Sequence, residues 1–210
     1  MTVETPPLRY EAELWAKGYK FIGGIDEAGR GAWAGPVCAA VVVLPPDPGI
    51  RLPLACVRDS KLMTALQRDA AAALIREHAS AWGVGFSSAE EIDQIGILPA
   101  TRQAVMRAIQ TLPVMPEFLL LDYIHWKELK NPHLMFPKGE SLSLSIASAS
   151  VLAKTSRDAL MKEMGQNYPV YGFEKHKGYG TKMHQQAIAS YGLCEIHRKS
   201  YSIMPGRPIA

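Results

Sequence analysis

The sequence predicts an α/β fold in which helices flank a mixed β-sheet. Four apolar segments have the composition of strands: residues 21–26, 37–44, 81–86 and 117–122. Helical patterns lie between and after them, so we expect three early strands joined by short turns and then helices around a fourth strand. The 210 residues, 48% hydrophobic and 20% charged, are enough for one good-sized soluble domain.

Helix starts and faces can be recognised in the middle of the chain. Residues 64–79 are rich in alanine, and Thr64 at their start is a candidate N-cap. Residues 88–95 and 99–112 are predicted to form two further helices. In the second of these, three apolar side chains fall on one face: Val105, Ile109 and Leu112.

The segment 141–161 combines two patterns. Residues 141–146 alternate like a strand, whereas the residues that follow are typical of a helix with a face of small side chains. We predict a helix for most of the segment, and its small residues would let it lie unusually close to a sheet. Lys154 and Asp158 are one helical turn apart, a spacing that favours an ion pair.

The most informative segment is residues 24–31, which read GIDEAGRG. Asp26 and Glu27 are adjacent carboxylates, which invite a divalent cation, and the glycines let the backbone approach a polar ligand closely. An Asp-Glu pair on its own most often lies on a solvated turn. Here the acids lie in or beside a buried strand, where unpaired charge is costly, and an arginine between two glycines follows. The segment is therefore predicted to be a functional turn suited to phosphate or sugar contact.

Aromatic residues, glycines and lysines are mixed in residues 171–182. The pattern predicts a loop that presents Tyr179 between two glycines, followed by a helix over about residues 182–190. An aromatic ring held amid lysines can stack against a sugar or a base. An equally good interpretation is that Tyr179 is a hydrophobic anchor for the C-terminal helix.

Basic residues are concentrated in the last fifth of the chain. Residues 171–210 contain six Lys or Arg and two acidic residues, although the whole chain has a net charge of only +3. A basic end beside an acidic core suits a polyanionic substrate, although a solvated helix surface has the same composition.

The cysteines and the apolar runs indicate where the protein acts. Cys38, Cys56 and Cys194 are far apart and lack metal-site spacing, so we expect reduced thiols in a cytoplasmic protein. No apolar run approaches the ~20 residues that span a bilayer. Residues 1–20 lack the continuous apolar core of a secretory signal.

Further short motifs follow one another along the chain: AGPV at 34–37, DSK at 59–61, LLLD at 119–122, KGES at 138–141, SIASAS at 145–150 with AK at 153–154, HKGYGT at 176–181 and EIHR at 195–198. Together with residues 24–31, and in this order, they resemble ribonuclease HII, the bacterial type 2 ribonuclease H. The match covers roughly residues 10–201. Any one motif is modest evidence, but the whole series in order is highly specific.

This resemblance implies a ribonuclease H-like fold, with a mixed five-stranded sheet flanked by helices and a C-terminal helical extension. It divides the chain into a lead-in (1–20), a catalytic core (21–167) and a substrate-binding helical extension (168–210). The implied activity is endonucleolytic cleavage of RNA in RNA/DNA hybrids and at ribonucleotides embedded in duplex DNA, as in ribonucleotide excision repair. It would leave 3′-hydroxyl and 5′-phosphate ends. The implied enzyme is a cytoplasmic monomer with no membrane association.

The resemblance also implies which residues do the chemistry. Two Mg²⁺ or Mn²⁺ ions, present with substrate, would be held by four acids: Asp26, Glu27, Asp122 and Glu140. Such hard cations accept oxygen ligands. The 2′-hydroxyl would be read by the backbone of Gly29, Arg30 and Gly31 and by the hydroxyl of Tyr179, which would also stack on the sugar. Phosphates would be held by Ser60, Lys61 and the basic tail.

Two positions depart from the family pattern. The fourth acid is usually aspartate, and Glu140 is one methylene longer, which leaves the geometry of the second metal open. Tyr123 stands where glycine is common, so its side chain must either pack away or narrow the groove.

Other classes stay as alternatives. One is a catalytically silent hybrid-binding module, which only Glu140 favours. Another is a DNA-cutting member of the ribonuclease H-like superfamily, such as a transposase or a junction-cutting nuclease. Residues 29–31 and Tyr179 argue against it, because DNA has no 2′-hydroxyl to read. Ribonuclease HIII is similar but usually has an extra N-terminal domain, whereas about twenty residues precede the first strand here.

Overall fold

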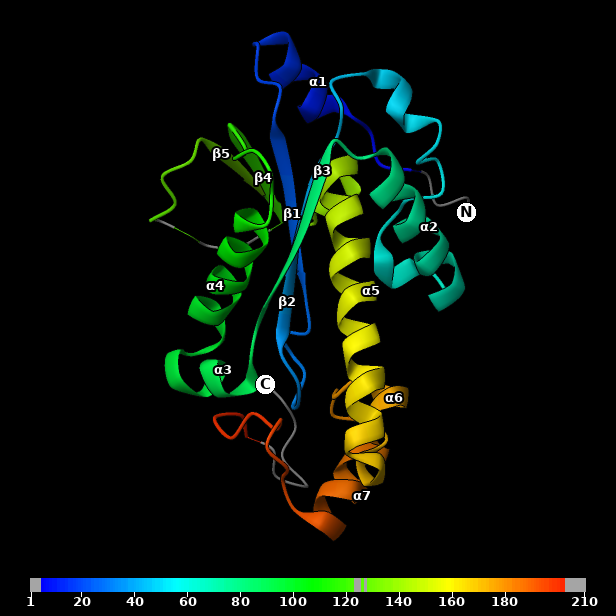
Figure 1. The fold of residues 1–210 in the computed structure, drawn as a ribbon, viewed down its shortest axis with the longest axis vertical. Coiled ribbons are helices and arrows are strands. Elements are labelled where there is room, and N and C mark those ends of the chain that lie inside the picture. Colours follow the sequence, from blue (N-terminus) through cyan, green and yellow to red (C-terminus); the bar gives the residue numbers. More distant parts are fainter. Residues whose placement is uncertain (1–4, 123–125, 127, 203–210) are drawn as a thin grey trace.

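In the computed structural model, which describes residues 5–122, 126 and 128–202, a five-stranded sheet lies between two layers of helices (Figure 1). The strands are β1 (Ile22–Ala28), β2 (Val37–Val43), β3 (Ala81–Ser87), β4 (Phe118–Asp122) and β5 (His133–Phe136). The helices are α1 (Arg9–Ala16), α2 (Ala65–His78), α3 (Ala89–Ile95), α4 (Ile97–Gln110), α5 (Leu144–Asn167), α6 (Phe173–His176) and α7 (Lys182–Tyr191). Tyr123 and residues 203–210 lie outside the described residues.

The sheet is mixed, as predicted, with the strand order β3-β2-β1-β4-β5. The pairs β1–β2 and β2–β3 are antiparallel, whereas β1–β4 and β4–β5 are parallel. All four strands expected from composition are present. The short edge strand β5 was not predicted from composition, because its apolar run is only three residues long and lies between Pro132 and Pro137. The expectation of short turns was right for β1–β2 and wrong for β2–β3, because residues 44–80 insert α2, which packs against the core.

Strand β2 is buried along its whole length between two apolar cores. Cys38, Ala40 and Val42 face the core shared with α2 and α5, whereas Ala39 and Val41 face the core shared with α4. This is the alternation of side chains that a pleated strand imposes. Accordingly, α2 and α5 lie on one side of the sheet and α3 and α4 on the other (Figure 1).

Local signals in the sequence set the helix starts. Thr64 caps α2 by accepting a hydrogen bond from the Gln67 amide, and the Gln67 side chain accepts one from the Thr64 amide. Ser88 and Glu91 form the same capping box at α3. The apolar face predicted for the α4 region is buried, at Val105, Ile109 and Leu112.

Helix α5 begins at Leu144, so the strand-like alternation of residues 141–146 does not form a strand. Its first turn lies directly against β1, because a Cβ atom on Gly24 would lie only 2.3 Å from the carbonyl carbon of Ser145. Small residues therefore allow the predicted close approach of helix and sheet. The buried Glu11 of α1 accepts hydrogen bonds of 2.6 Å from the hydroxyls of Ser143 and Ser145 and so fastens this end of α5.

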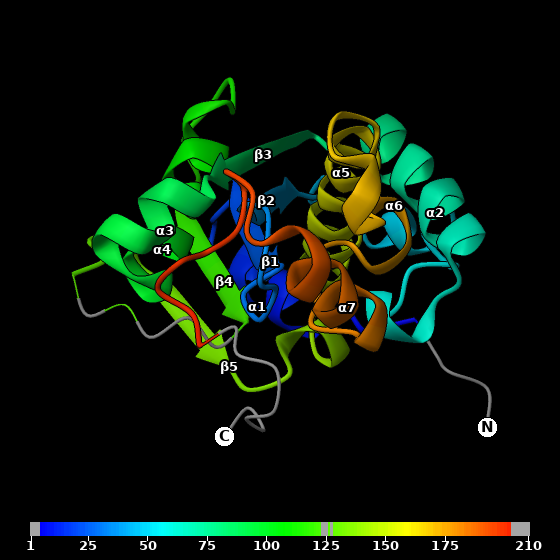
Figure 2. The same cartoon turned by 90° about the horizontal axis from the view of Figure 1, so that it is seen from below.

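Helices α6 and α7 lie at the end of α5 that is remote from α1 (Figures 1 and 2). The helix predicted at 182–190 is α7. Met161 of α5, Phe173 of α6 and Ala187 of α7 share a buried cluster with Ala34, which lies between β1 and β2. This cluster joins the β1–β2 loop to the C-terminal helices and so brings residues 24–35 beside Tyr179.

The cysteines agree with the expectation of thiols, since Cys38, Cys56 and Cys194 are all free. Over the residues that the structure describes, no helix has the length and apolar character needed to cross a membrane.

Candidate active site

Two of the predicted acids lie on neighbouring parallel strands. Asp26 belongs to β1 and Asp122 ends β4. The register pairs Ile25 with Leu121, so the two aspartates occupy equivalent positions on adjacent strands. Ligands in open α/β sheets bind outside the carboxyl ends of parallel strands, and these side chains occupy such an edge.

A backbone hydrogen bond brings the fourth acid to the same edge. The Gly139 amide donates to Oδ1 of Asp122 at 2.7 Å, and Glu140 follows in a short 3₁₀ helix, Gly139–Ser141. A Cβ atom on Gly139 would lie 2.8 Å from Cδ1 of Ile146, so a larger residue here would have to displace the end of that side chain. Glu140 is 6% exposed, and its Oε1 is 3.8 Å from Nζ of Lys61.

A cavity of about 300 Å³ opens at these residues. Its lining contains Asp26, Glu27, Ala28, Gly29, Arg30, Ser60, Lys61, Asp122, Ser150, Lys154 and Tyr179. Eight of the ten residues predicted for the site therefore line one cavity. Glu140 joins the group through Asp122 and Lys61, and the remaining one, Gly31, follows Arg30 in the loop.

The carboxylates share an environment that disfavours their ionised forms. Burial raises the pKa of Asp26 well above its ordinary value, and the charges of Glu27 and Asp122 raise it further, while a hydrogen bond from Ser150 opposes them. Burial also raises the pKa of Glu27 and Glu140. Because these carboxylates are crowded and resist ionisation, a cation bound between them would stabilise their ionised forms.

The donor set fits a hard divalent cation. Oε2 of Glu27 and Oε2 of Glu140 are buried and have no hydrogen-bond partner among the described residues. Buried oxygens of this kind need a partner, and carboxylate oxygens are the ligands that Mg²⁺ and Mn²⁺ accept. The other oxygens are partly engaged, since Oε1 of Glu27 accepts from Arg30 at 2.9 Å. No three His, Cys, Asp or Glu side chains in the described ranges are already arranged around a common metal position.

Arg198 orients the loop of residues 29–31. Its buried guanidinium donates to the carbonyls of Gly29 and Arg30, at 2.7 Å each, and to that of Gly35 at 3.0 Å. In a trans peptide the carbonyl and the following N–H point in opposite directions. The amides of Arg30 and Gly31 therefore point away from Arg198 and are free to meet a ligand.

A second buried arginine, Arg157, joins this loop region to the segment that carries Tyr179. It donates to the carbonyls of Pro36, Lys177 and Ala34 at 2.8, 2.9 and 3.1 Å. Gly29, with φ of +91°, leaves the room it needs, because a Cβ there would lie 1.9 Å from its Nε. The guanidinium carbon is also 5.4 Å from the centre of the Tyr179 ring.

Two histidines fix the backbone of Tyr179. Nδ1 of His197 accepts from the Cys194 amide at 2.9 Å, so its Nε2 carries the proton and donates to Nε2 of His184 at 3.0 Å. Nδ1 of His184 then donates to the Tyr179 carbonyl at 3.0 Å. The ring of Tyr179 lies in the cavity lining with Lys154 Nζ 5.6 Å from its centre, which favours the substrate-contact interpretation over a purely structural anchor.

The two predicted phosphate contacts differ in their freedom. The Lys61 side chain is 76% exposed and can move to a ligand. Ser60 is buried, and its hydroxyl is 2.9 Å from that of Ser150, so it supports the wall of the cavity. Lys154 pairs with Asp158 at 2.8 Å, as predicted.

Sequence reasoning missed the roles of Ser150, Arg157 and Arg198. Each lies in or beside a motif that the sequence singled out, but nothing in a motif shows which side chain turns inward. Arg157 lies between Ser156 and Asp158, and Arg198 between His197 and Lys199, so no apolar run marked either side chain as buried.

The mixed sheet, with carboxylates on adjacent parallel strands and a basic helical extension beside them, defines a nucleic-acid-cleaving enzyme of the ribonuclease H type. Residues 23–204 match the family model of Ribonuclease HII, and the chain belongs to the ribonuclease HII family. It is 44% identical over 193 residues to Ribonuclease HII of Acetivibrio thermocellus, covering 92% of this chain and 74% of that protein. Ribonuclease HII of Herpetosiphon aurantiacus is 45% identical, with 91% and 93% covered.

Solved structures confirm the fold. The ribonuclease H2 from Pyrococcus horikoshii OT3 has a TM-score of 0.71 at 22% identity, with 87% of this chain and 94% of that chain covered. Bst-RNase HIII in complex with Mn²⁺ has a TM-score of 0.69 at 17% identity, with 88% and 68% covered. These structures show that the chain has the ribonuclease H fold, and its membership of the ribonuclease HII family makes it a nuclease.

Proposed function

We propose that the protein is an endoribonuclease that cleaves the RNA strand of RNA/DNA hybrids and cuts at ribonucleotides embedded in duplex DNA. It leaves 3′-hydroxyl and 5′-phosphate ends, acts as a cytoplasmic monomer and serves ribonucleotide excision repair. Residues 21–167 form the catalytic core, and residues 168–210 bind substrate. Family membership supports the reaction class, and the geometry of the cavity supports the choice of substrate.

The observation that carries the proposal is the pair of buried, unpartnered carboxylate oxygens of Glu27 and Glu140 beside Asp26 and Asp122. These four acids would hold two Mg²⁺ or Mn²⁺ ions together with substrate. When bound, such ions activate the attacking water and stabilise the leaving oxygen. The chain's own part is to hold the four carboxylates on rigid elements: two strands, and a turn fastened to Asp122 by the Gly139 amide.

Recognition of the ribonucleotide rests on groups that hydrogen-bond a 2′-hydroxyl. The amides of Arg30 and Gly31 face away from Arg198, and the Tyr179 phenol lines the same cavity. The Tyr179 ring would stack on the sugar at the junction between ribonucleotide and deoxyribonucleotide. DNA lacks the hydroxyl, so an all-DNA duplex would leave these donors unpaired.

The decisive variant is Asp122→Asn. It removes a carboxylate charge and keeps the size of the side chain and an oxygen that can accept from the Gly139 amide. We expect cleavage of a duplex with one ribonucleotide to fall below ~1% of wild type, since losing a group that stabilises charge in the transition state costs about 10²–10³ in rate. Binding of the hybrid, measured by fluorescence anisotropy, should stay within a few-fold. Near-normal turnover in a folded variant would refute the assignment.

Two controls test the other classes. A silent hybrid-binding module would bind the ribonucleotide-containing duplex and leave it uncut in both metals. A DNA nuclease would cut the matched all-DNA duplex as well. We expect cleavage of the first duplex only, at the ribonucleotide.

A further inference from the structure

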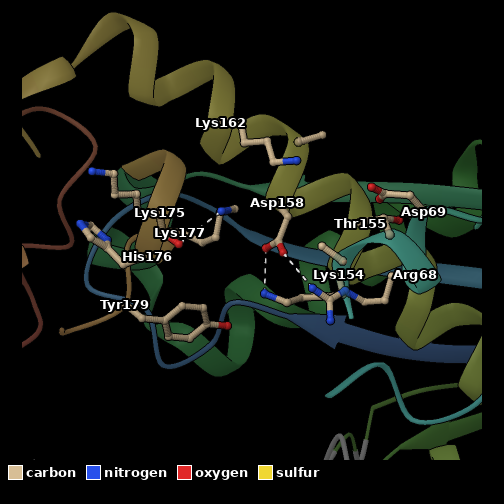
Figure 3. Close-up of a pocket in the computed structure, with 12 residues that line it drawn as sticks. Arg68, Asp69, Lys154, Thr155, Asp158, Lys162, Lys175, His176, Lys177 and Tyr179 are labelled. Carbon is tan, nitrogen blue, oxygen red and sulfur yellow. Dashed lines mark hydrogen bonds and ion pairs between the residues drawn. The ribbon is translucent and has the colours of Figure 1, made fainter. Parts of the chain in front are cut away.

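A second cavity, of about 330 Å³, lies along α5 beside the catalytic cavity (Figure 3). Cationic side chains dominate its lining: Arg68, Lys154, Lys162, Lys175 and Lys177. They come from α2, from two turns of α5 and from the segment of α6, so the fold gathers them from three separate parts of the chain. The acids of the lining are Asp69 and Asp158.

Asp158 is already neutralised by two of these cations. Its carboxylate is 2.8 Å from Nζ of Lys154 and 3.7 Å from Nη2 of Arg68. Figure 3 shows both contacts as dashed lines; Lys162 and Lys177 line the same pocket, and the Lys177 amine donates to the Glu174 carbonyl. Within the described residues neither Lys162 nor Lys177 forms an ion pair within 4.0 Å. The pocket therefore keeps positive charge that the protein does not balance.

The backbone at Lys177 is held in an unusual conformation. Its φ is +54°, in the left-handed region that residues other than glycine rarely adopt, and its carbonyl accepts from buried Arg157. Burial lowers the pKa of its amine, the charge of Asp158 opposes this effect, and the charges of Lys162 and Lys154 lower the pKa further. An anion placed between these amines would remove that repulsion.

The two cavities are neighbours that share two lining residues. Lys154 and Tyr179 line both of them. A nucleic-acid strand that places one phosphodiester at the carboxylates and a sugar against Tyr179 therefore passes directly to the second cavity.

We propose that this basic pocket binds one backbone phosphate of the substrate strand, on one side of the cleaved bond. The inference rests on the proposed function and adds to it a phosphodiester subsite formed by Lys162 and Lys177, with Lys154 and Arg68 held ready by Asp158. Its role is to set the register of the strand, so that the ribonucleotide and not its neighbour meets the carboxylates.

The first test compares salt dependence. The double variant Lys162→Gln/Lys177→Gln is made in the Asp122→Asn background, and Lys17→Gln is the matched control. Lys17 is an exposed lysine at the end of α1, at the opposite end of the molecule (Figure 1). We expect the slope of log K against log salt to fall in magnitude by about 0.9 for each phosphate that the variant no longer neutralises. The control should retain the slope of its parent.

The second test locates the phosphate. A series of duplexes is made, each with one uncharged methylphosphonate at a different position around the ribonucleotide. The binding of each duplex to the parent and to the lysine variant is then measured. One position should weaken binding by the parent several-fold and have no further effect in the lysine variant. If the lysine variant keeps the parent's slope and position profile while wild type cleaves normally, the subsite is refuted and the proposed function stands. If wild type fails to cut the ribonucleotide-containing duplex, both are refuted.

Discussion

At the scale of single residues, Glu140 is the most unusual feature of the site. Its extra methylene is accommodated by a turn that the Gly139 amide ties to Asp122, and one carboxylate oxygen is left buried without a partner among the described residues. Lys61 approaches the other oxygen to 3.8 Å. The longer side chain thus reaches the group of acids from a turn that is fastened to Asp122.

Shortening this side chain tests that interpretation. Glu140→Asp draws the carboxylate back by about one C–C bond and should keep cleavage within about tenfold of wild type while changing the ratio of Mg²⁺-supported to Mn²⁺-supported rates. Metal titrations of kcat in both ions measure this, with Glu13→Asp on exposed α1 as the control. A variant that is inactive in both metals would show that the surroundings are built for glutamate.

Arg198 shows how one residue controls the backbone of a recognition loop. It is fully buried, and three carbonyls depend on it. Lysine at this position would keep the charge but lose the planar fork of donors.

We expect Arg198→Lys to lose about 3 kcal/mol or more of unfolding free energy, because each buried carbonyl left without its donor costs ~1–3 kcal/mol. At a temperature where the variant is folded, kcat/KM for the ribonucleotide-containing duplex should fall at least tenfold. Urea unfolding and single-turnover kinetics measure both effects. Tyr201→Phe, which removes only the hydroxyl that donates to the Arg30 carbonyl and accepts from Arg198, is the milder comparison. Unchanged kcat/KM in folded Arg198→Lys would contradict the orienting role.

At the scale of elements, α5 connects the parts of the site. Its first turn contacts β1 at Gly24, its middle carries Ser150, Lys154 and Arg157, and its end packs against α6. Because one rigid helix spans these contacts, the carboxylates and the Tyr179 segment keep a fixed relation. A flexible loop in its place would let the two cavities move relative to each other.

The C-terminal elements depend on a network of neutral histidines. Burial lowers the pKa of His184 to about 4, and it also lowers the pKa of His176 and His197. In the unfolded chain these groups take up protons near pH 6.5. Protonation of His184 would put hydrogens on both nitrogens of its hydrogen bond with His197, and protonation of His197 would put one on the Nδ1 that accepts from the Cys194 amide.

This network predicts how the stability of the whole molecule depends on pH. Between pH 6.5 and 4 the unfolded chain binds more protons at His184 than the folded chain does, so the free energy of unfolding falls as the pH falls through that window. From pH 7.5 to 5.0 the loss due to His184 is roughly 2 kcal/mol. Urea unfolding of His184→Gln should show a pH dependence smaller by that amount. If the unfolding free energy of His184→Gln depends on pH as strongly as that of wild type, the assignment of His184 as a buried, neutral side chain is wrong.

Other groups act in different pH ranges or in the opposite direction. The Arg107 guanidinium holds the pKa of Glu91 down at about 2, so the stability from that pair is lost only as the pH falls below about 4.5. The raised pKa values of Asp26, Glu27 and Glu140 instead favour the folded state as the pH falls. Comparing His184→Gln with wild type cancels these shared contributions.

At the scale of the whole molecule, local patterns in the sequence predicted most elements and much of the site. Apolar runs predicted β1 to β4, and the capping residue Thr64 predicted the start of α2, because these signals act over a few neighbouring residues. The motif resemblance assigned Asp26, Glu27 and Asp122, which lie on adjacent strands or in the cavity they share. Strand β5 was not predicted from composition because its apolar run of three residues, bounded by prolines, is too short to indicate a strand.

By itself, the sequence determined the family, the acidic residues and the elements that carry them. The signals for all of these lie in short runs of neighbouring residues. Only the tertiary structure decided that Arg157 and Arg198 turn inward to hold the loop and Tyr179, and that α2, α5 and the α6 segment gather cationic side chains into a second pocket. The physical reason is distance along the chain. Residues more than a hundred positions apart meet only once the sheet and α5 have packed.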